Sequence, residues 1–159
     1  MTIRRGGLLD DASHRLLAAW AADCAEHVLD IFTAGRPGDD RPAAAIVTVR
    51  RWAAGEVSML VAREAAFAAH AAAREASGAA QHVARAAGHA VATAHMADHE
   101  LGAAFFALRA VEAAAPDDPD AVAHERRWQR DQLPPDVAAL VLDDMRRRAG
   151  MFGSAFDPA

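Results

Sequence analysis

The stretch that decides the fold runs from Arg63 to His99 and reads REAAFAAHAAAREASGAAQHVARAAGHAVATAHMADH. Nearly all of its apolar positions are alanine, which has the highest helix propensity of all residues and a very small side chain. Alanine helices can approach one another closely, although each alanine contributes little apolar area to a core. The stretch also concentrates the histidines of the chain, namely His70, His82, His89, His95 and His99. It therefore predicts a close-packed, histidine-bearing helical centre.

The composition around this stretch predicts a single all-α domain over residues 1–159. A chain of this length is able to bury about two-thirds of the surface that its unfolded form exposes. Hydrophobic residues make up 53% of the chain, but aromatic residues make up only 6%. The large core side chains must therefore be spread over several helices, and we predict a compact bundle of six to seven helices. Residues 151–159 either dock through Phe152 and Phe156 or form a loose tail.

Capping residues and turn signals place the expected helices. Asp10 or Ser13 is suited to cap the first helix, and Ser58 is suited to cap the third. No stretch shows the alternating pattern of a strand. The expected helices lie at about 10–33, 40–55, 59–75, 79–95, 98–114, 119–131 and 135–149.

The charge and the cysteine content narrow the functional class. The formal net charge is −5, which disfavours a general nucleic-acid binder because phosphate neutralisation needs a basic face. A cationic protein partner is easier to accommodate. The single cysteine, Cys24, rules out an internal disulfide and fits a reducing compartment. We find no signal peptide and no stretch that spans a bilayer, so we expect a cytoplasmic protein without membrane contact.

Histidines, arginines and one aspartate border the apolar stripes of several expected helices. Asp23 and His27 are four residues apart, so the carboxylate can hold the imidazole on one helix face. Arg63 and Arg74 flank His70, where they either grip a carboxylate or phosphate or are simply solvated. We predict that the candidate histidines form one polar cluster, hydrogen-bonded to Asp23 or to backbone, because a buried imidazole needs partners. The candidates for this polar centre are Asp23, His27, Arg63, His70, Arg74, His89 and His95.

Two patterns raise the possibility of a metal site or a nucleophile. His95 and His99 have the spacing that places two imidazoles on one helix face. They do not form an HExxH motif, however, and a helix break near Asp98 is expected because an unbroken helix would be about 54 Å long. Cys24 and His27 could pair as thiolate and imidazolium, but cysteine on an apolar stripe is usually a small buried hydrophobe. We therefore predict no metal, no cofactor and no catalytic residue, and an enzyme is the less favoured class.

Ordered sequence blocks carry a resemblance to a known family. They are WAADCAEHVLDIF, DDRPAAAI, WAAGEVS with AREAAFAAHAAARE, and ARAAGHAVATAHMADHELGAA. Together they resemble a bacterial family of immunity proteins, similar to the fifth type of polymorphic-toxin immunity domain, over about residues 20–116. The matching positions are Asp23, His27, Asp40, Arg41, Pro42, Trp52, Gly55, Glu56, Arg63, His70, Arg74, Gly88, His89 and His95.

The resemblance implies an all-helical domain with an antitoxin role. Our leading expectation is therefore an immunity protein that binds and neutralises a bacterial toxin. The alternative is a helical-bundle enzyme, or a protein that binds a small ligand or metal in a centre lined by His, Arg and Asp. A closed pocket lined by the polar-centre candidates would favour this alternative.

An acidic surface is the predicted contact for a toxin. Toxins that act on nucleic acid are basic near their active sites, so an acidic inhibitor gains steering and specificity. We expect the acids at helix starts to form one negative rim, and a tryptophan to anchor the complex. The rim candidates are Asp39, Asp40, Asp117, Asp118, Asp120 and Asp136, and the anchor candidates are Trp52 and Trp128.

Overall fold

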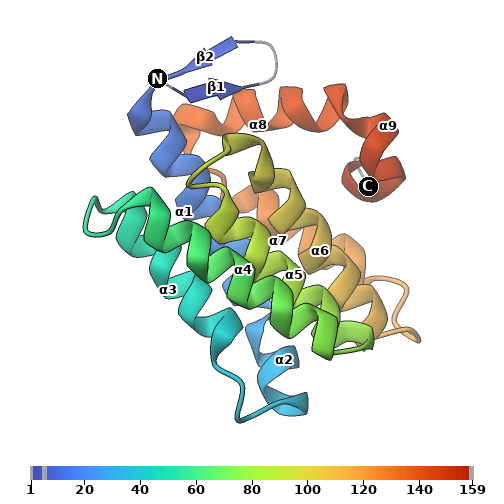
Figure 1. The fold of residues 1–159 in the computed structure, drawn as a ribbon. Helices are drawn as coiled ribbons and strands as arrows, with labels where there is room; N and C mark the ends of the chain where they lie inside the picture. Colours follow the sequence, from blue (N-terminus) through green and yellow to red (C-terminus); the bar gives the residue numbers. More distant parts are fainter. Residues whose placement is uncertain (1, 5–6, 158–159) are drawn as a thin grey trace.

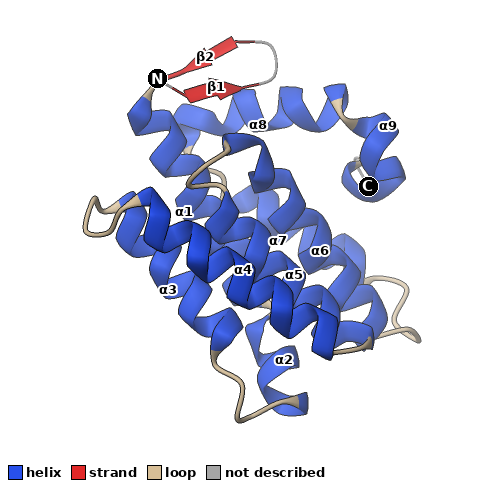
Figure 2. Cartoon of the chain, viewed as in Figure 1, coloured by secondary structure: helices blue, strands red, loops and turns tan. Residues whose placement is uncertain are grey.

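The computed structural model describes residues 2–4 and 7–157. The all-α prediction is confirmed, since nearly every element is a helix (Figure 2). The helices are α1 (Asp11–His27), α2 (Leu29–Gly35), α3 (Arg41–Ala53), α4 (Met59–Glu75), α5 (Gly78–Ala92), α6 (Glu100–Ala114), α7 (Ala121–Asp131), α8 (Pro135–Arg147) and α9 (Ala149–Phe152), with 3-10 turns η1 (Ala97–His99) and η2 (Gly153–Phe156). Within these residues, no helix combines the length and the apolar character that crossing a membrane requires.

Helix α5 lies at the centre of the part of the bundle that α1 to α6 form. It packs along its length against α4 and α6, and α1, α2 and α3 also contact it (Figure 1). The buried side chains on α4 and α5 are mostly alanine, including Ala62, Ala69, Ala84, Ala87 and Ala90. Small side chains allow these helices to lie close together, as the sequence predicts.

Larger apolar side chains form a second part of the core, between α1, α6 and α8. Leu17, Trp20 and Leu101 are fully buried there, and Val137 of α8 packs with them. The indole nitrogen of Trp20 donates a hydrogen bond of 2.8 Å to the main-chain oxygen of Gln129, which satisfies its only donor. Helix α8 lies across the end of the bundle that carries the N-terminal hairpin (Figure 1).

Two helix starts follow the local sequence signals. The carboxylate of Asp10 caps α1 by accepting a hydrogen bond of 2.7 Å from the amide of Ser13. The hydroxyl of Ser58 caps α4 by accepting one of 3.4 Å from the amide of Val61. The break expected near Asp98 is also present, because α5 ends and α6 begins on either side of η1.

Two features differ from the sequence-based expectation. Residues Thr2–Arg4 (β1) and Gly7–Leu9 (β2) form an antiparallel hairpin, and strands of three residues are too short to show an alternating pattern. The first helix does not continue to Thr33 but ends at His27, and α2 begins after a bend at Val28. The bend allows the start of α2 to pack against α5 and to bury apolar side chains there.

The C-terminal end packs onto the bundle as far as it is described. Phe156 is buried, Phe152 is half-buried, and the guanidinium of Arg130 donates a hydrogen bond to the main-chain oxygen of Phe156. Residues 158–159 of the predicted tail lie outside the described residues. The described part of this segment therefore docks through the two phenylalanines.

Candidate functional site

Neighbouring histidine rings form a chain where α4, α5 and α6 meet. His70 comes from α4, His89 from α5, and His95 and His99 from the segment between α5 and α6. The ring centroids are 5.3 Å apart for His70 and His89, 5.1 Å for His89 and His99, and 5.2 Å for His99 and His95. We call these residues the histidine cluster. It contains three of the histidines that we expected to meet, together with His99.

Two glycines make room for two of these rings. Gly88 in α5 lies beside His70, and a Cβ atom at this glycine would come within 2.6 Å of Cε1 of the ring. Gly102 in α6 lies beside His89, where a Cβ atom would be 2.5 Å from Nδ1. Both distances are far below an ordinary carbon contact of about 3.5–4.0 Å. Each glycine therefore allows an imidazole to lie directly against a helix backbone.

Burial favours the neutral form of His89 and His99 near pH 7. Desolvation is the largest cause that lowers the pKa of His89 to about 3 and that of His99 to about 4, and neighbouring histidines lower both further. The pKa values of His70 and His95 are also lowered, first by burial and then by nearby arginines. A neutral imidazole has one N–H donor and one acceptor nitrogen. The Nδ1 atoms of His89 and His99, 3.0 Å apart, therefore share one hydrogen bond between a donor ring and an acceptor ring.

Arginines surround the histidine cluster with positive charge. Arg63, Arg74 and Arg85 are exposed, and their charges act on cluster members. Arg148, just beyond the end of α8, is buried and is held by the carboxylate of Asp144 at 3.1 Å. These charges oppose protonation of the rings, so the arginines and the burial act in the same direction.

The imidazole nitrogens of the histidine cluster are not arranged as a metal site. Within the described residues, no three His, Cys, Asp or Glu side chains are grouped so that they could hold a metal ion. His95 and His99, the candidates for a metal pair, are neighbours, but Nδ1 of His99 already faces His89. The arrangement seen is a hydrogen-bonded pair of imidazoles with a further ring on each side.

His27 and Asp23 are not part of the histidine cluster, and their predicted contact with each other is wrong. Nδ1 of His27 lies 2.7 Å from a carboxylate oxygen of Glu125, and its ring stacks on Trp128 with the centroids 3.6 Å apart. Asp23 pairs instead with Arg50 at 2.9 Å. Helix α7 brings a buried carboxylate to the end of α1, and a buried acceptor needs a donor more than an exposed one does. Spacing along one helix cannot reveal this contact.

Cys24 lies close to the same contacts but is not an activated thiol. It is fully buried, and burial raises its pKa well above the ordinary value, with the carboxylates of Glu125 and Asp23 acting in the same direction. Nucleophilic attack and metal binding both need the thiolate. The environment of Cys24 therefore suits a small buried hydrophobe.

The part of the chain that contains the histidine cluster matches a known protein family. Residues 7–136 match the family described as Imm-5 like putative immunity protein, which is well over half of the chain. The chain belongs to this family. The match includes the whole histidine cluster and the ordered blocks quoted from the sequence. Neither a curated protein nor a solved structure matches the chain.

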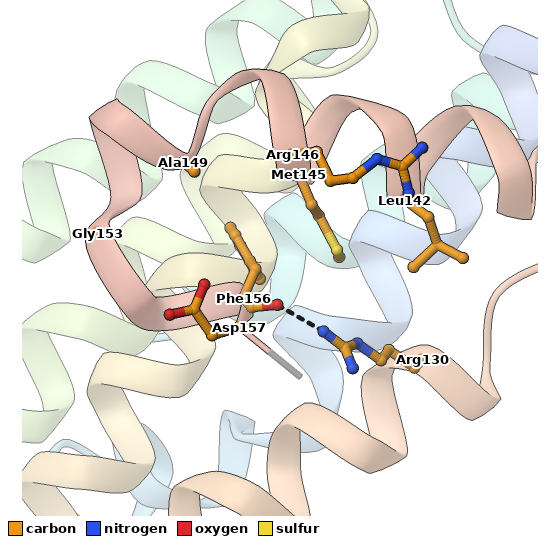
Figure 3. A pocket seen from close by; sticks show the side chains of 8 residues that line it. All are labelled: Arg130, Leu142, Met145, Arg146, Ala149, Gly153, Phe156 and Asp157. Atoms are coloured by element: carbon orange, nitrogen blue, oxygen red, sulfur yellow. Dashed lines mark hydrogen bonds between the residues drawn. The ribbon is translucent and has the colours of Figure 1, made fainter. Parts of the chain in front are cut away.

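The match to the immunity-protein family ends in the first turn of α8, so the rest of α8 and the C-terminal segment after it lie outside the matched residues. This segment supplies Arg148, whose charge acts on the cluster. It also forms a pocket of about 380 Å³ against α7 (Figure 3). Figure 3 shows the guanidinium of Arg130 in the wall of this pocket, hydrogen-bonded to the main-chain oxygen of Phe156. The pocket is thus a consequence of how the C-terminal end docks.

The acids expected to contact a toxin have different surroundings. Asp39 is only 12% exposed and is bound by the guanidinium of Arg41 at 2.6 Å, which holds the pKa of that carboxyl below its usual value. Helix α8, whose first turn contains Asp136, lies at the end of the bundle opposite α2 (Figure 1). Asp136 therefore does not share one rim with Asp39. The remaining members are exposed, namely Asp40, Asp117, Asp118 and Asp120.

The two candidate tryptophans are engaged within the chain. Trp52 is half-buried, with its ring 4.9 Å from that of His14, and Trp128 is half-buried against His27. The strongly exposed apolar side chains lie elsewhere, and α4 carries Leu60 at 62% and Phe67 at 61% exposure. The sequence did not predict that these two side chains are exposed, because a single apolar position on a helix gives no sign of which face is covered.

Proposed function

We propose that the chain neutralises a bacterial protein toxin by binding it directly. Membership of the immunity-protein family is the observation that carries this proposal. Leu60 and Phe67 add to it, because both are exposed on α4 and large apolar side chains grouped on one surface can mark a protein contact. Inhibition by direct binding needs no catalytic group in the inhibitor, only a surface that covers the toxin.

Two surfaces are available for this contact. The exposed acids Asp40, Asp117, Asp118 and Asp120 suit a basic toxin, and the loops that carry them both lie in the lower half of Figure 1. The outer face of α4 is the other surface, and its chemistry is different because it combines apolar groups with arginines.

The alternative function, in which a polar centre binds a small ligand, is less well supported by the geometry. A closed pocket lined by Asp23, His27 and members of the histidine cluster together would favour this alternative. Asp23 binds Arg50, and His27 binds Glu125. Asp23 and His27 therefore make contacts of their own outside the histidine cluster, which is why we favour the first function.

The test of toxin neutralisation is coexpression. A toxin domain taken from the neighbourhood of the gene is produced in a host that it kills, with and without the chain. We expect growth to be restored by the chain and the two purified proteins to form a stoichiometric complex in size-exclusion chromatography. A Leu101→Asp variant, which places a charge in the core, is the control that should fail to fold and to protect. Absence of both rescue and complex with the wild-type chain would refute the proposal.

A further inference from the structure

The outer face of α4 presents two large apolar side chains to solvent. Leu60 and Phe67 are both more than 60% exposed and are seven residues apart, which places them on the same side of the helix about 10 Å apart. Helix α4 packs mainly against α3 and α5, and it lies at the front of the bundle in Figure 1. Its remaining side is therefore available to a partner.

Arginines lie beside these apolar groups. Arg63 and Arg74 share the stripe of Leu60 and Phe67 at helical spacing, and Arg85 follows on α5. The guanidinium of Arg63 lies 5.6 Å from the centre of the Phe67 ring, and that of Arg85 lies 5.5 Å from an aromatic ring of α6. None of these arginines takes part in an ion pair between described residues. We call Leu60, Arg63, Phe67, Arg74 and Arg85 the α4–α5 face.

This face has the opposite charge to the chain as a whole. The net charge is −5, but many other arginines are neutralised internally, as Arg41 and Arg50 are by pairs of carboxylates. The adjacent rings of His70 and His95 have lowered pKa values and add no charge near neutral pH. Glu64 is an exposed carboxylate on the same helix, at the edge of the face. The α4–α5 face is therefore a positive patch with apolar groups at its centre.

We infer that the α4–α5 face binds the toxin and recognises an acidic, partly apolar surface on it, an inference that rests on the proposed function. Arginine can donate two parallel hydrogen bonds to one carboxylate. Arginine and aromatic residues are also enriched at the centres of protein interfaces. In this complex Phe67 enters an apolar depression of the toxin, while Arg63, Arg74 and Arg85 pair with surrounding carboxylates.

The test compares full-length variants by biolayer interferometry, with the same toxin domain, purified, as the probe. Phe67→Ala is expected to dissociate at least tenfold faster, because it removes the aromatic anchor. The double variant Arg74→Ala, Arg85→Ala is expected to associate more slowly and with a shallower salt dependence, since charges mainly set the association rate. Glu64→Gln removes a carboxylate that repels an acidic partner and is expected to speed association.

Two variants serve as matched controls. Leu8 is 71% exposed on β2, and Arg127 is exposed on α7, so Leu8→Ala and Arg127→Ala remove similar groups outside the face. Both are expected to bind within twofold of the wild type. Circular dichroism melts check that every variant is folded, as expected from the exposure of Phe67.

The outcomes separate this inference from the proposed function. Tight wild-type binding with unchanged rates for Phe67→Ala and for the double arginine variant overturns the inference and leaves toxin neutralisation intact. The inference is also overturned if binding is lost only when the acids of the loop between α6 and α7 are changed to asparagine. Failure of the wild-type chain to bind overturns the proposed function, and the inference falls with it.

Discussion

Replacing Gly102 by alanine is expected to destabilise the fold, although alanine is the better helix former. The new Cβ atom would lie 2.5 Å from Nδ1 and 2.8 Å from Cγ of His89. Gly102 is buried inside α6, so the backbone has little room to move away. The ring of His89 can give way only by losing its 3.0 Å hydrogen bond with His99. In Gly102→Ala the higher helix propensity of alanine stabilises the fold, whereas the contact with His89 destabilises it.

The magnitude follows from three contributions. A glycine-to-alanine change inside a helix adds about 1 kcal/mol to the free energy of unfolding. Overpacking of a buried site typically removes about 1–3 kcal/mol, and loss of a hydrogen bond removes about 0.5–1.5 kcal/mol. The unfavourable contributions are the larger, so we expect Gly102→Ala to lower the free energy of unfolding by about 1–3 kcal/mol.

Urea unfolding followed by circular dichroism measures this difference. Gly150→Ala in α9 is the matched control, because a Cβ atom there meets nothing within 4 Å, and its free energy of unfolding should be unchanged or slightly raised. Adding His89→Ala to Gly102→Ala should restore part of the loss, since the clash is with the imidazole. The reasoning is refuted if Gly102→Ala is as stable as the wild type, or if the two changes act additively.

Three further predictions concern pH, a buried carboxylate and the C-terminal end. The pKa values of His89 and His99 fall from 6.5 to about 3 and about 4 on folding, so the unfolded chain binds more protons. The contribution of these two neutral imidazoles to the free energy of unfolding is complete above pH 6.5 and is lost as the pH falls through their pKa values in the folded chain. The free energy of unfolding of His89→Gln, measured by urea titration at several pH values, should therefore depend less on pH than that of the wild type. Glu125→Ala leaves the donors of His27 and Gln129 without this acceptor and should lower the free energy of unfolding by about 2–4 kcal/mol in urea titrations, with Glu125→Gln less affected. Phe156→Ala should lower it by about 3 kcal/mol and should speed proteolysis near the C-terminus.

The helices were predictable from the sequence because their signals are local. Asp10 and Ser58 cap α1 and α4 through their own side chains, and each cap is recognisable within four residues of sequence. The break before α6 was also predictable, since an unbroken helix would be too long for a domain of this size. The caps depend on neighbouring residues and the break on the size of the domain, and neither depends on what the helix later packs against.

The histidine cluster was partly predictable for a related reason. The turn between α4 and α5 is short, so the two helices must lie side by side and antiparallel. His70 and His89 are thereby brought together. Gly102 is a further signal that the sequence analysis did not use, because a glycine inside a helix pattern often marks a close approach. The sequence could not show that the approaching group is the ring of His89.

The partner of His27 could not have been found from local spacing. Glu125 lies 98 positions further along the chain, and its position depends on how α7 packs over the end of α1. An aspartate was available four residues before His27, which made the local contact the natural prediction. The same limitation explains why Trp128 was expected to be an exposed anchor when it in fact stacks on His27.

The sign of the α4–α5 face differs from the sign of the total charge. A net charge of −5 suggests a basic toxin, but the charge that a partner meets depends on which groups are already paired. Between Arg63 and Arg74 most positions are alanine, so few carboxylates are close enough to neutralise the two guanidinium groups. Neither arginine has a carboxylate three or four residues away on its own helix, the spacing at which side chains on a helix pair. An acidic protein can in this way present a positive face, and it is on this charge that our inference of an acidic toxin surface rests.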